Sequence, residues 1–255
     1  MDQLRARADG ECAMADKAQI LQSVRAALSS EPQVDLHNHP IAIDFDDGTL
    51  TLGGEVARVA AKKLALEAAA GVPEVTGIID RLRVTPAQPM GDGEIRDLVR
   101  DSLLQEPAFA EFAIEEQVKG EVVTVRASPV DTRGYIEVAV DDGVVTLNGE
   151  VPGLDDKRLA GVLAWWVPGS RDVINGLAVE PPEDDSFDKI AEAVRLVLEK
   201  DPYVDAGQIR VGVRDRIVTL AGLLPSESQR DMAACDAWYV FGVDNVVNDI
   251  EVHRY

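Results

Sequence analysis

Apolar residues recur along the chain in a pattern that appears three times. Each copy opens with Ile, Val and Leu at positions i, i+4 and i+8, which places the three side chains on one face of a helix. A proline twelve residues after the Ile ends each helix, because proline cannot continue its hydrogen bonding. The residues are Ile20, Val24, Leu28 and Pro32; Ile95, Val99, Leu103 and Pro107; and Ile190, Val194, Leu198 and Pro202.

Downstream of each helix, apolar and polar residues alternate as they do in half-buried strands. The three stretches read IAIDFDDGTLTLGGEV, IEVAVDDGVVTLNGEV and IRVGVRDRIVTLAGLL. Asp47-Gly48 and the equivalent Asp142-Gly143 suit the positive φ angles of a tight hairpin turn. The third copy has Asp215-Arg216 instead. We therefore expect a different or more strained connection there.

The second half of each copy keeps a constant spacing. From the glycines Gly54, Gly149 and Gly222, the copies run without gaps to Val84, Val179 and Val252, each thirty residues later. A second helix and a third strand, which reads IIDRLRV, VINGLAV or VVNDIEV, fill this interval. Ser226 and Gln229 predict a capping box at the start of the last of these helices.

Each copy therefore has the order helix, strand, strand, helix, strand. The short turn makes the first two strands antiparallel, and the helical crossover is long enough for the third strand to pair in parallel. The sequence predicts an α/β fold of the α+β type. It contains three tandem modules, each a three-stranded mixed sheet with two helices on one face.

Exposed linkers are predicted where Pro, Gly and acidic residues gather, at residues 85–93 and 180–186. The predicted organisation is a polar leader at 1–15 and modules at 16–85, 92–180 and 183–255. The middle module carries an insertion at about 108–134, which includes a strand-like stretch at 122–126. We expect this insertion to be an added hairpin or an ordered loop.

The charge of the chain narrows its possible partners. It has 25 Lys and Arg against 46 Asp and Glu, and the net charge of -21 repels phosphate backbones and anionic membrane surfaces. We therefore predict no nucleic-acid partner and only weak binding to anionic membranes. No transmembrane segment is predicted, because no stretch approaches the ~18 consecutive apolar residues of a spanning helix. The oligomeric state is left open.

Two features bear on the compartment. The first twenty residues carry scattered charges where an export signal needs an apolar run of about 7–15 residues. Cys12 and Cys235 have the spacing of neither a disulfide framework nor a zinc site. Both features favour the cytoplasm. The periplasm is the alternative if the natural N-terminus differs.

The three copies resemble the BON family, named for bacterial osmotic-stress and nodulation proteins, and the middle copy resembles it most closely. The resemblance rests on an apolar helix that ends at proline, DGVVTLNGEV, a helix with Lys and Arg, and VPGSRDVINGLAV, in that order. It implies a non-enzymatic module that binds phospholipid membranes or proteins in envelope maintenance and stress response, usually in the periplasm. Cytoplasmic relatives that bind potassium make a small-cation sensor the alternative function.

Five polar or small residues of the shared pattern are interpreted as structural. Gly54, Gly149 and Gly222 follow strands, where glycine permits unusual φ angles or close packing. Asn175 and Asn248 lie among inward apolar positions, where a polar side chain needs a hydrogen bond. The first copy departs from this pattern, because it has Asp80 at the equivalent position.

No catalytic or metal site is predicted. His37 and His39 would share a face on a strand and supply two metal ligands, with no evident third ligand. The acidic stretches 153–157 and 183–188 lack the ligand spacing of a calcium loop. No phosphate loop or nucleophile elbow is present, so we predict no cofactor and no enzyme. An enzyme with an unrecognised site is the alternative of a different class.

Aromatic residues provide the candidate binding site. WWVPG in the second copy and WYVFG in the third stand at equivalent positions near the end of the second helix. Adjacent large rings cannot all face one core, so some must lie at an interface. We predict a partner-binding site around Trp165, Trp166, Trp238 and Tyr239, which contacts either a neighbouring module or an external partner.

Overall fold

The computed structural model describes residues 17–127 and 134–253. The chain divides into two compact units, of which the first ends at Thr85 and the second begins at Pro86. The first unit holds one copy of the repeat, which we call module 1. The second unit holds the other two copies, modules 2 and 3.

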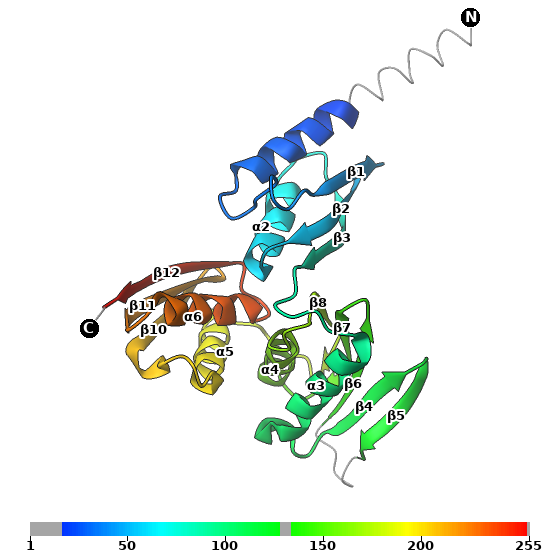
Figure 1. The fold of residues 1–255 in the computed structure, drawn as a ribbon, viewed down its shortest axis with the longest axis vertical. Coiled ribbons are helices and arrows are strands. Elements are labelled where there is room, and N and C mark those ends of the chain that lie inside the picture. The colour runs from blue at the N-terminus through cyan, green and yellow to red at the C-terminus, as the bar shows by residue number, and fades with distance from the viewer. Residues whose placement is uncertain (1–16, 128–133, 254–255) are drawn as a thin grey trace, which may run out of the picture. The chain divides into compact units, whose positions relative to one another are not determined.

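Module 1 has the predicted order of elements (Figure 1). A helix over residues 17–30 is followed by β1 (Ala42–Asp46), β2 (Thr49–Val56), α2 (Val59–Ala70) and β3 (Gly77–Val84). The central strand β2 is antiparallel to β1 and parallel to β3. Val24 and Leu28 of the apolar stripe are fully buried, as are Leu50 and Leu52 of β2. The helical stripe and the strand alternation therefore serve the same core.

Module 2 has a larger sheet than predicted. Its elements are α3 (Asp92–Gln105), η1 (Pro107–Phe109), β4 (Ala113–Val118), β5 (Glu121–Arg126), β6 (Tyr135–Asp141), β7 (Val144–Val151), α4 (Leu154–Trp165), β8 (Asp172–Asn175) and β9 (Ala178–Val179). The strand order is β5-β4-β6-β7-β8, and β9 also pairs with β7. The sheet has six strands rather than three because the insertion adds the hairpin β4–β5, in which β4 pairs parallel to β6, and because the expected third strand is divided into β8 and β9. The broader prediction of mixed sheets joined to helices is confirmed.

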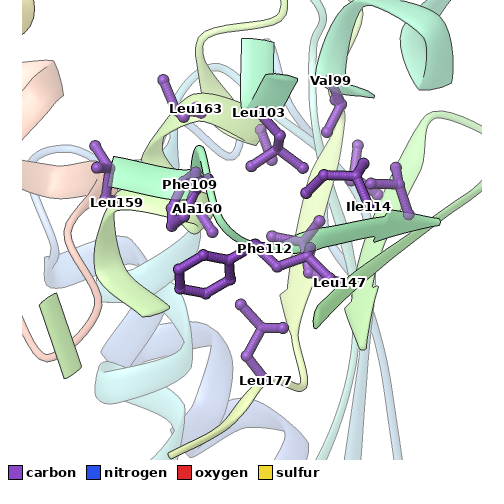
Figure 2. Close-up of a cluster of buried hydrophobic side chains, with 14 of the residues drawn as sticks. Val99, Leu103, Phe109, Phe112, Ile114, Leu147, Leu159, Ala160, Leu163 and Leu177 are labelled. Atoms are coloured by element: carbon purple, nitrogen blue, oxygen red, sulfur yellow. The ribbon is translucent and has the colours of Figure 1, made fainter. Parts of the chain in front are cut away.

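The core of module 2 lies between its helices and its sheet (Figure 2). Val99 and Leu103 of α3 pack there with Leu163 of α4, as the apolar stripe predicts. Phe109 and Phe112 also belong to this core, with their rings edge to face and their centroids 5.1 Å apart. Both rings come directly before β4, so the added hairpin is anchored to the core at its base.

Module 3 has the predicted three strands. Its elements are α5 (Phe187–Lys200), η2 (Ala206–Gln208), β10 (Ile209–Arg214), β11 (Ile217–Leu224), α6 (Glu227–Tyr239) and β12 (Asn245–Val252). The central β11 is antiparallel to β10 and parallel to β12. The Ser226 hydroxyl accepts from the backbone N–H of Gln229 at 3.2 Å and caps α6. The capping box is half formed, because the buried Gln229 Oε1 has no hydrogen-bond partner.

The three hairpins of the repeat close with a two-residue turn of the same kind. Asp47 and Gly48 have φ angles of 43° and 78°, and Asp215 and Arg216 have φ angles of 50° and 61°. The ladders pair the residues that flank these turns directly, so only two residues are left to reverse the chain. The third turn therefore has the same length as the other two, and of the two expected outcomes, a different or a more strained connection, the strained one is found. Arg216 adopts a left-handed backbone conformation that favours glycine.

The helices of each module in the second unit share one face of the sheet. In module 2, α3 packs on α4 and on β6, and α4 packs on β7. In module 3, α5 packs on α6 and on β10, and α6 packs on β11. The opposite face carries no helix of its own module. We call it the helix-free face.

Candidate functional site

Amides on the third strand bind the second helix in modules 2 and 3. Asn175 donates from Nδ2 to the carbonyl of Lys157 at 2.7 Å, and Asn248 donates to the carbonyl of Arg230 at 3.0 Å. In each case the side-chain oxygen accepts from the backbone N–H two residues later. Both amides are thus engaged within their own module and join a strand to a helix.

Module 1 makes the same connection with charged groups. Asp80 accepts from the N–H of Leu82 at 2.9 Å, and its other carboxylate oxygen lies 2.9 Å from Lys62 Nζ. Lys62 is buried and also donates to the carbonyl of Leu82. A carboxylate cannot donate to the helix, so the ion pair between Asp80 and Lys62 takes the place of the amide's hydrogen bond.

The shared glycines lie where the two strands of each hairpin come close. A Cβ on Gly149 would stand 2.1 Å from the carbonyl oxygen of Tyr135, and a Cβ on Gly222 would stand 2.0 Å from that of Gln208. Gly54 is in the equivalent place and has a φ of 129°. Any side chain here would push the strands apart, so the backbone itself requires glycine.

His37 and His39 lie in the loop before β1 and not on a strand. Asp35 holds this loop, because its Oδ1 accepts from the backbone N–H groups of His37 and Asn38, each at 3.0 Å. Hydrogen bonds from Asn38 are the main reason that the pKa of Asp35 lies below its usual value. Among residues 17–127 and 134–253, no group of three or more His, Cys, Asp or Glu side chains is placed to hold a metal ion.

Three of the four predicted aromatic residues meet between modules 2 and 3. Trp166, at the end of α4, donates from Nε1 to Oδ1 of Asp236 on α6 at 2.9 Å. Trp165 stacks on Tyr239 with ring centroids 5.7 Å apart and an angle of 10° between the planes. Trp238 is buried near the end of α6. We call the contact formed by Trp165, Trp166, Asp236 and Tyr239 the aromatic junction.

Apolar packing continues from the aromatic junction into both modules. Trp166 packs against the buried core of module 2 and against that of module 3. Val162, one turn earlier on α4, is fully buried in the core of module 3. A helix of one module therefore supplies a core residue to the other, which explains why the two form one compact unit.

Asp236 is a buried carboxyl at the centre of this contact. Desolvation is the main reason that the pKa of Asp236 is raised to about 8; the hydrogen bond from Trp166 opposes the increase, and the carboxyl of Asp201 adds to it. Its Oδ2 is buried and accepts no hydrogen bond. The protonated form of Asp236 therefore predominates near neutral pH.

Arg158 is a residue of this contact that the sequence analysis missed. It lies on α4 of module 2 and is only 1% exposed. Its Nε donates to the carbonyl of Phe241 at 2.9 Å, and its Nη2 donates to Asp185 at 2.5 Å. Phe241 follows α6, and Asp185 lies just before α5. In the sequence Arg158 stood beside Lys157 on a predicted helix, with no signal that distinguished it from an exposed arginine.

Further ion pairs extend the contact. Arg216 Nη2 lies 3.4 Å from the second carboxylate oxygen of Asp185, so the strained turn residue joins the same group of charges. On another side, Lys200 at the end of α5 donates to both carboxylate oxygens of Glu106 at 2.8 and 2.9 Å. Glu106 directly follows α3, so this pair also connects module 3 to module 2.

One aliphatic residue is exposed at the same place on the third strand of each module. In modules 2 and 3 it lies on the helix-free face; in module 1 it lies on the face opposite the buried Leu82 and Val84, to which we give the same name. The residues are Ile79 on β3, Ile174 on β8 and Val247 on β12, which are 45%, 51% and 41% exposed. We call them the strand-three positions. Each pairs with a threonine of the central strand, namely Thr51, Thr146 or Thr219. A single exposed apolar side chain is ordinary on a protein surface, so the distinguishing feature of these positions is that they recur at one place in all three modules.

The charge beside the strand-three positions differs between modules. The next two alternate residues are Arg81 and Arg83 in module 1, Gly176 and Ala178 in module 2, and Asp249 and Glu251 in module 3. Alternate residues of a strand point to the same side of the sheet. The residues that directly follow the strand-three positions on this side are therefore basic in module 1, uncharged in module 2 and acidic in module 3.

A comparison with protein families accounts for the repeat. The BON domain profile matches residues 16–86, 128–181 and 186–254, which together exceed half of the chain. The chain belongs to the BON family. Neither α3 nor the hairpin β4–β5 falls within a matched segment. The hairpin β4–β5 has no counterpart in the described parts of modules 1 and 3.

The chain is also similar to individual known proteins. It is 26% identical over 162 residues to osmotically-inducible protein Y of Escherichia coli (strain K12). The aligned region covers 64% of this chain and 72% of that protein. Two solved structures of CdsD, a structural protein of the type III secretion system of Chlamydia trachomatis, align at 12% identity with a TM-score of 0.24. The alignments cover 91% and 93% of this chain, and 96% and 93% of the two CdsD chains. A TM-score this low does not establish a shared overall fold.

The helices of the BON modules are short. The longest of the labelled ones, α3 and α5, have 14 residues each. In the parts of the chain that the structure describes, no helix has both the length and the apolar character needed to span a bilayer.

Proposed function

We propose that this BON protein is a non-catalytic binding and scaffolding protein of a stress response, and that its helix-free faces bind a protein partner. The observation that carries the proposal is the exposure of an aliphatic side chain at Ile79, Ile174 and Val247. Exposed apolar residues at the same place in three sheets favour a binding role over a packing role. The similarity to a protein named as osmotically inducible supports the stress context.

Electrostatics favours a protein over phospholipid as the partner. A net charge of -21 opposes approach to anionic headgroups. The basic side chains of module 1 do not reverse this, because Arg83 pairs across the ladder with Glu55, and Asp44 lies opposite Thr51 on the same face. Phospholipid, which the family resemblance implies, is the competing ligand.

The aromatic junction has a separate role in this proposal. We propose that Trp165, Trp166 and Tyr239 hold modules 2 and 3 in one unit, so that their two helix-free faces are presented at a fixed spacing. Module 1 has Ala70 and Gly71 where module 2 has its two tryptophans. It lacks the rings for such a junction and forms a unit of its own.

Affinity capture from the source organism tests this function. The baits are the full-length chain, a triple variant with Ser at Ile79, Ile174 and Val247, and a control with Ser at Leu98, Phe187 and Tyr203. The control residues are also exposed and apolar but lie outside the sheets. We expect the wild type and the control to capture the same protein and the triple variant to capture roughly tenfold less. Equal capture by all three baits would overturn the proposed surface.

Vesicle flotation distinguishes protein from lipid. With vesicles of phosphatidylglycerol and phosphatidylcholine at physiological salt, we expect little binding, because the charged chain is repelled. Strong flotation that the triple variant loses would assign the same faces to phospholipid.

Calorimetric titration addresses the cation-sensing alternative. The carboxylates of the chain attract cations diffusely, and such attraction produces no saturable heat. We therefore expect flat traces with potassium and calcium chloride. A saturable isotherm accompanied by a thermal shift would establish sensing in place of scaffolding.

We keep the cytoplasm as the proposed compartment and the periplasm as its alternative. Cell fractionation tests the choice, with a cytoplasmic and a periplasmic marker enzyme followed in the same samples. Recovery with the periplasmic marker would contradict the proposal.

A further inference from the structure

The inserted hairpin of module 2 ends in an exposed strand. β5 is the outermost strand of the six-stranded sheet and pairs only with β4 among the described strands. Its valines Val122, Val123 and Val125 are 52%, 43% and 38% exposed. In Figure 1, no other described segment of the second unit runs along its outer edge. The unpaired backbone of β5 is therefore accessible together with apolar side chains.

Folded proteins usually protect such an edge. Short length, proline or inward lysines prevent the free N–H and C=O groups of an edge strand from recruiting another strand. The sequence of β5, EVVTVR, has no proline and carries charge only at its two ends. Its one irregularity is a register shift opposite Ile114 and Glu115, which leaves residues 121–124 in regular pairing. An edge of this kind is suited to pairing with a further strand.

We propose that β5 pairs antiparallel with β5 of a second copy of this chain, with the two-fold axis near Val123. Antiparallel pairing about Val123 sets Glu121 of each strand opposite Val125 of the other and one position from its Arg126, so opposite charges lie near each other at both ends of the new ladder, on opposite faces of the sheet. Parallel pairing would place Glu121 beside Glu121. Charge thus favours the antiparallel arrangement.

The position of Arg126 supports this arrangement. Its guanidinium donates to the carbonyl oxygens of Phe109 and Phe112, which belong to the module 2 core. The cationic end of β5 is therefore held in place. An apolar middle with opposite charges at the two ends is self-complementary under a two-fold rotation, as an interface between identical copies requires.

The size of the contact sets its strength. A ladder of six residues buries less than the ~1,200–2,000 Å² of a stable interface, so association is weak and depends on concentration. The net charge of -21 on each copy opposes association. Salt screens this repulsion, with a Debye length of about 8 Å at physiological ionic strength, so association strengthens as sodium chloride is added.

Sedimentation velocity on the full chain over a roughly hundredfold concentration range tests the proposal. We expect a monomer–dimer equilibrium that tightens with salt and that Val123→Lys weakens by at least about tenfold. The matched control is Leu98→Lys, an exposed position on α3 of the same module, which leaves the equilibrium unchanged. A monomer at every concentration, or a dimer that Val123→Lys does not affect, would overturn the proposal.

Disulfide trapping provides a second test that does not depend on affinity. Single cysteines are placed at Val122, Val123, Thr124 and Leu98 in a chain with Cys12→Ser and Cys235→Ser. Antiparallel pairing brings like residues within disulfide distance only near the two-fold axis. We expect dimers to peak at one position of β5 and to be absent at Leu98. No trapped dimer, or equal trapping at all positions, excludes a β5 pair.

Discussion

Trp166 and Asp236 join two BON modules through a hydrogen bond of 2.9 Å from the indole Nε1–H to the carboxyl Oδ1. The two residues come from different modules, and both lie among the apolar side chains that connect the two cores. Asp236 is buried there beside the carboxyl of Asp201. The stability of the second unit should therefore depend on this donor and on pH.

Replacing the donor should destabilise the second unit. Trp166→Phe removes the indole N–H, so Asp236 Oδ1 loses its hydrogen-bond donor. The expected decrease in the free energy of unfolding is about 1–3 kcal/mol. Urea denaturation measures the change. Trp165→Phe is the control, because a phenyl ring keeps the stacking on Tyr239. Equal losses in the two variants would contradict a specific role for the hydrogen bond.

The raised pKa of Asp236 predicts a pH dependence of stability. In the unfolded chain this carboxyl ionises near 3.8, whereas in the folded protein it ionises at about 8. Between these values the folded state binds one more proton, so stability is greatest on the acid side and decreases as the pH rises. The slope from this group is about −1.4 kcal/mol per pH unit, and it levels off above the folded pKa.

Asp236→Asn removes this titration. Urea denaturation from about pH 6 to pH 8, a range in which ordinary carboxyls stay ionised, should show a flatter dependence for the variant than for the wild type. The amide also has N–H groups to donate to Asp201. Parallel curves for the two proteins would show that Asp236 does not titrate in this range.

Arg158 should contribute more to stability than other arginines of module 2. Arg158→Met removes a buried donor from the Phe241 carbonyl and from Asp185, with an expected loss of about 3 kcal/mol. Arg171→Met is the control, because Arg171 bonds the exposed Asp142 and should cost less than about 1 kcal/mol. Denaturation curves of the two variants provide the measurement. A loss at Arg171 as large as that at Arg158 would refute the ranking.

We expect that the amide connection between strand and helix in module 3 can be replaced by the ion pair that makes this connection in module 1. Asn248→Asp removes the donor to the Arg230 carbonyl and should cost about 1–3 kcal/mol. Adding Arg230→Lys should restore part of the loss, because it recreates the pair that Lys62 and Asp80 form in module 1. Thermal denaturation of the single and double variants tests this. A double variant less stable than Asn248→Asp alone would reject the proposed equivalence.

Local patterns in the sequence predicted the elements of each module. The stripe of Val24 and Leu28, the alternation through Leu50 and Leu52, and the adjacent rings of Trp165 and Trp166 all reflect side-chain direction within one element. Such direction follows from the helical and strand periods alone. These predictions needed no knowledge of how distant segments pack.

The missed features depend on segments far apart in the chain. Arg158 and Asp236 look like surface residues in the sequence, and both are buried only because a second module covers them. Asp215-Arg216 was expected to form a different or more strained turn; the ladders beside it fix a two-residue turn, and the strain falls on Arg216. The size of the middle sheet could not be predicted because an insertion of that length fits a loop as well as a hairpin.

The most direct test of the central claim uses methyl NMR. Isoleucine and valine methyl groups are labelled in the full chain, and the protein recovered by affinity capture is added. The account predicts that the methyl signals of Ile79, Ile174 and Val247 shift or broaden, while those of core residues such as Val99 and Val162 stay in place. Changes confined to residues away from the helix-free faces would contradict the account.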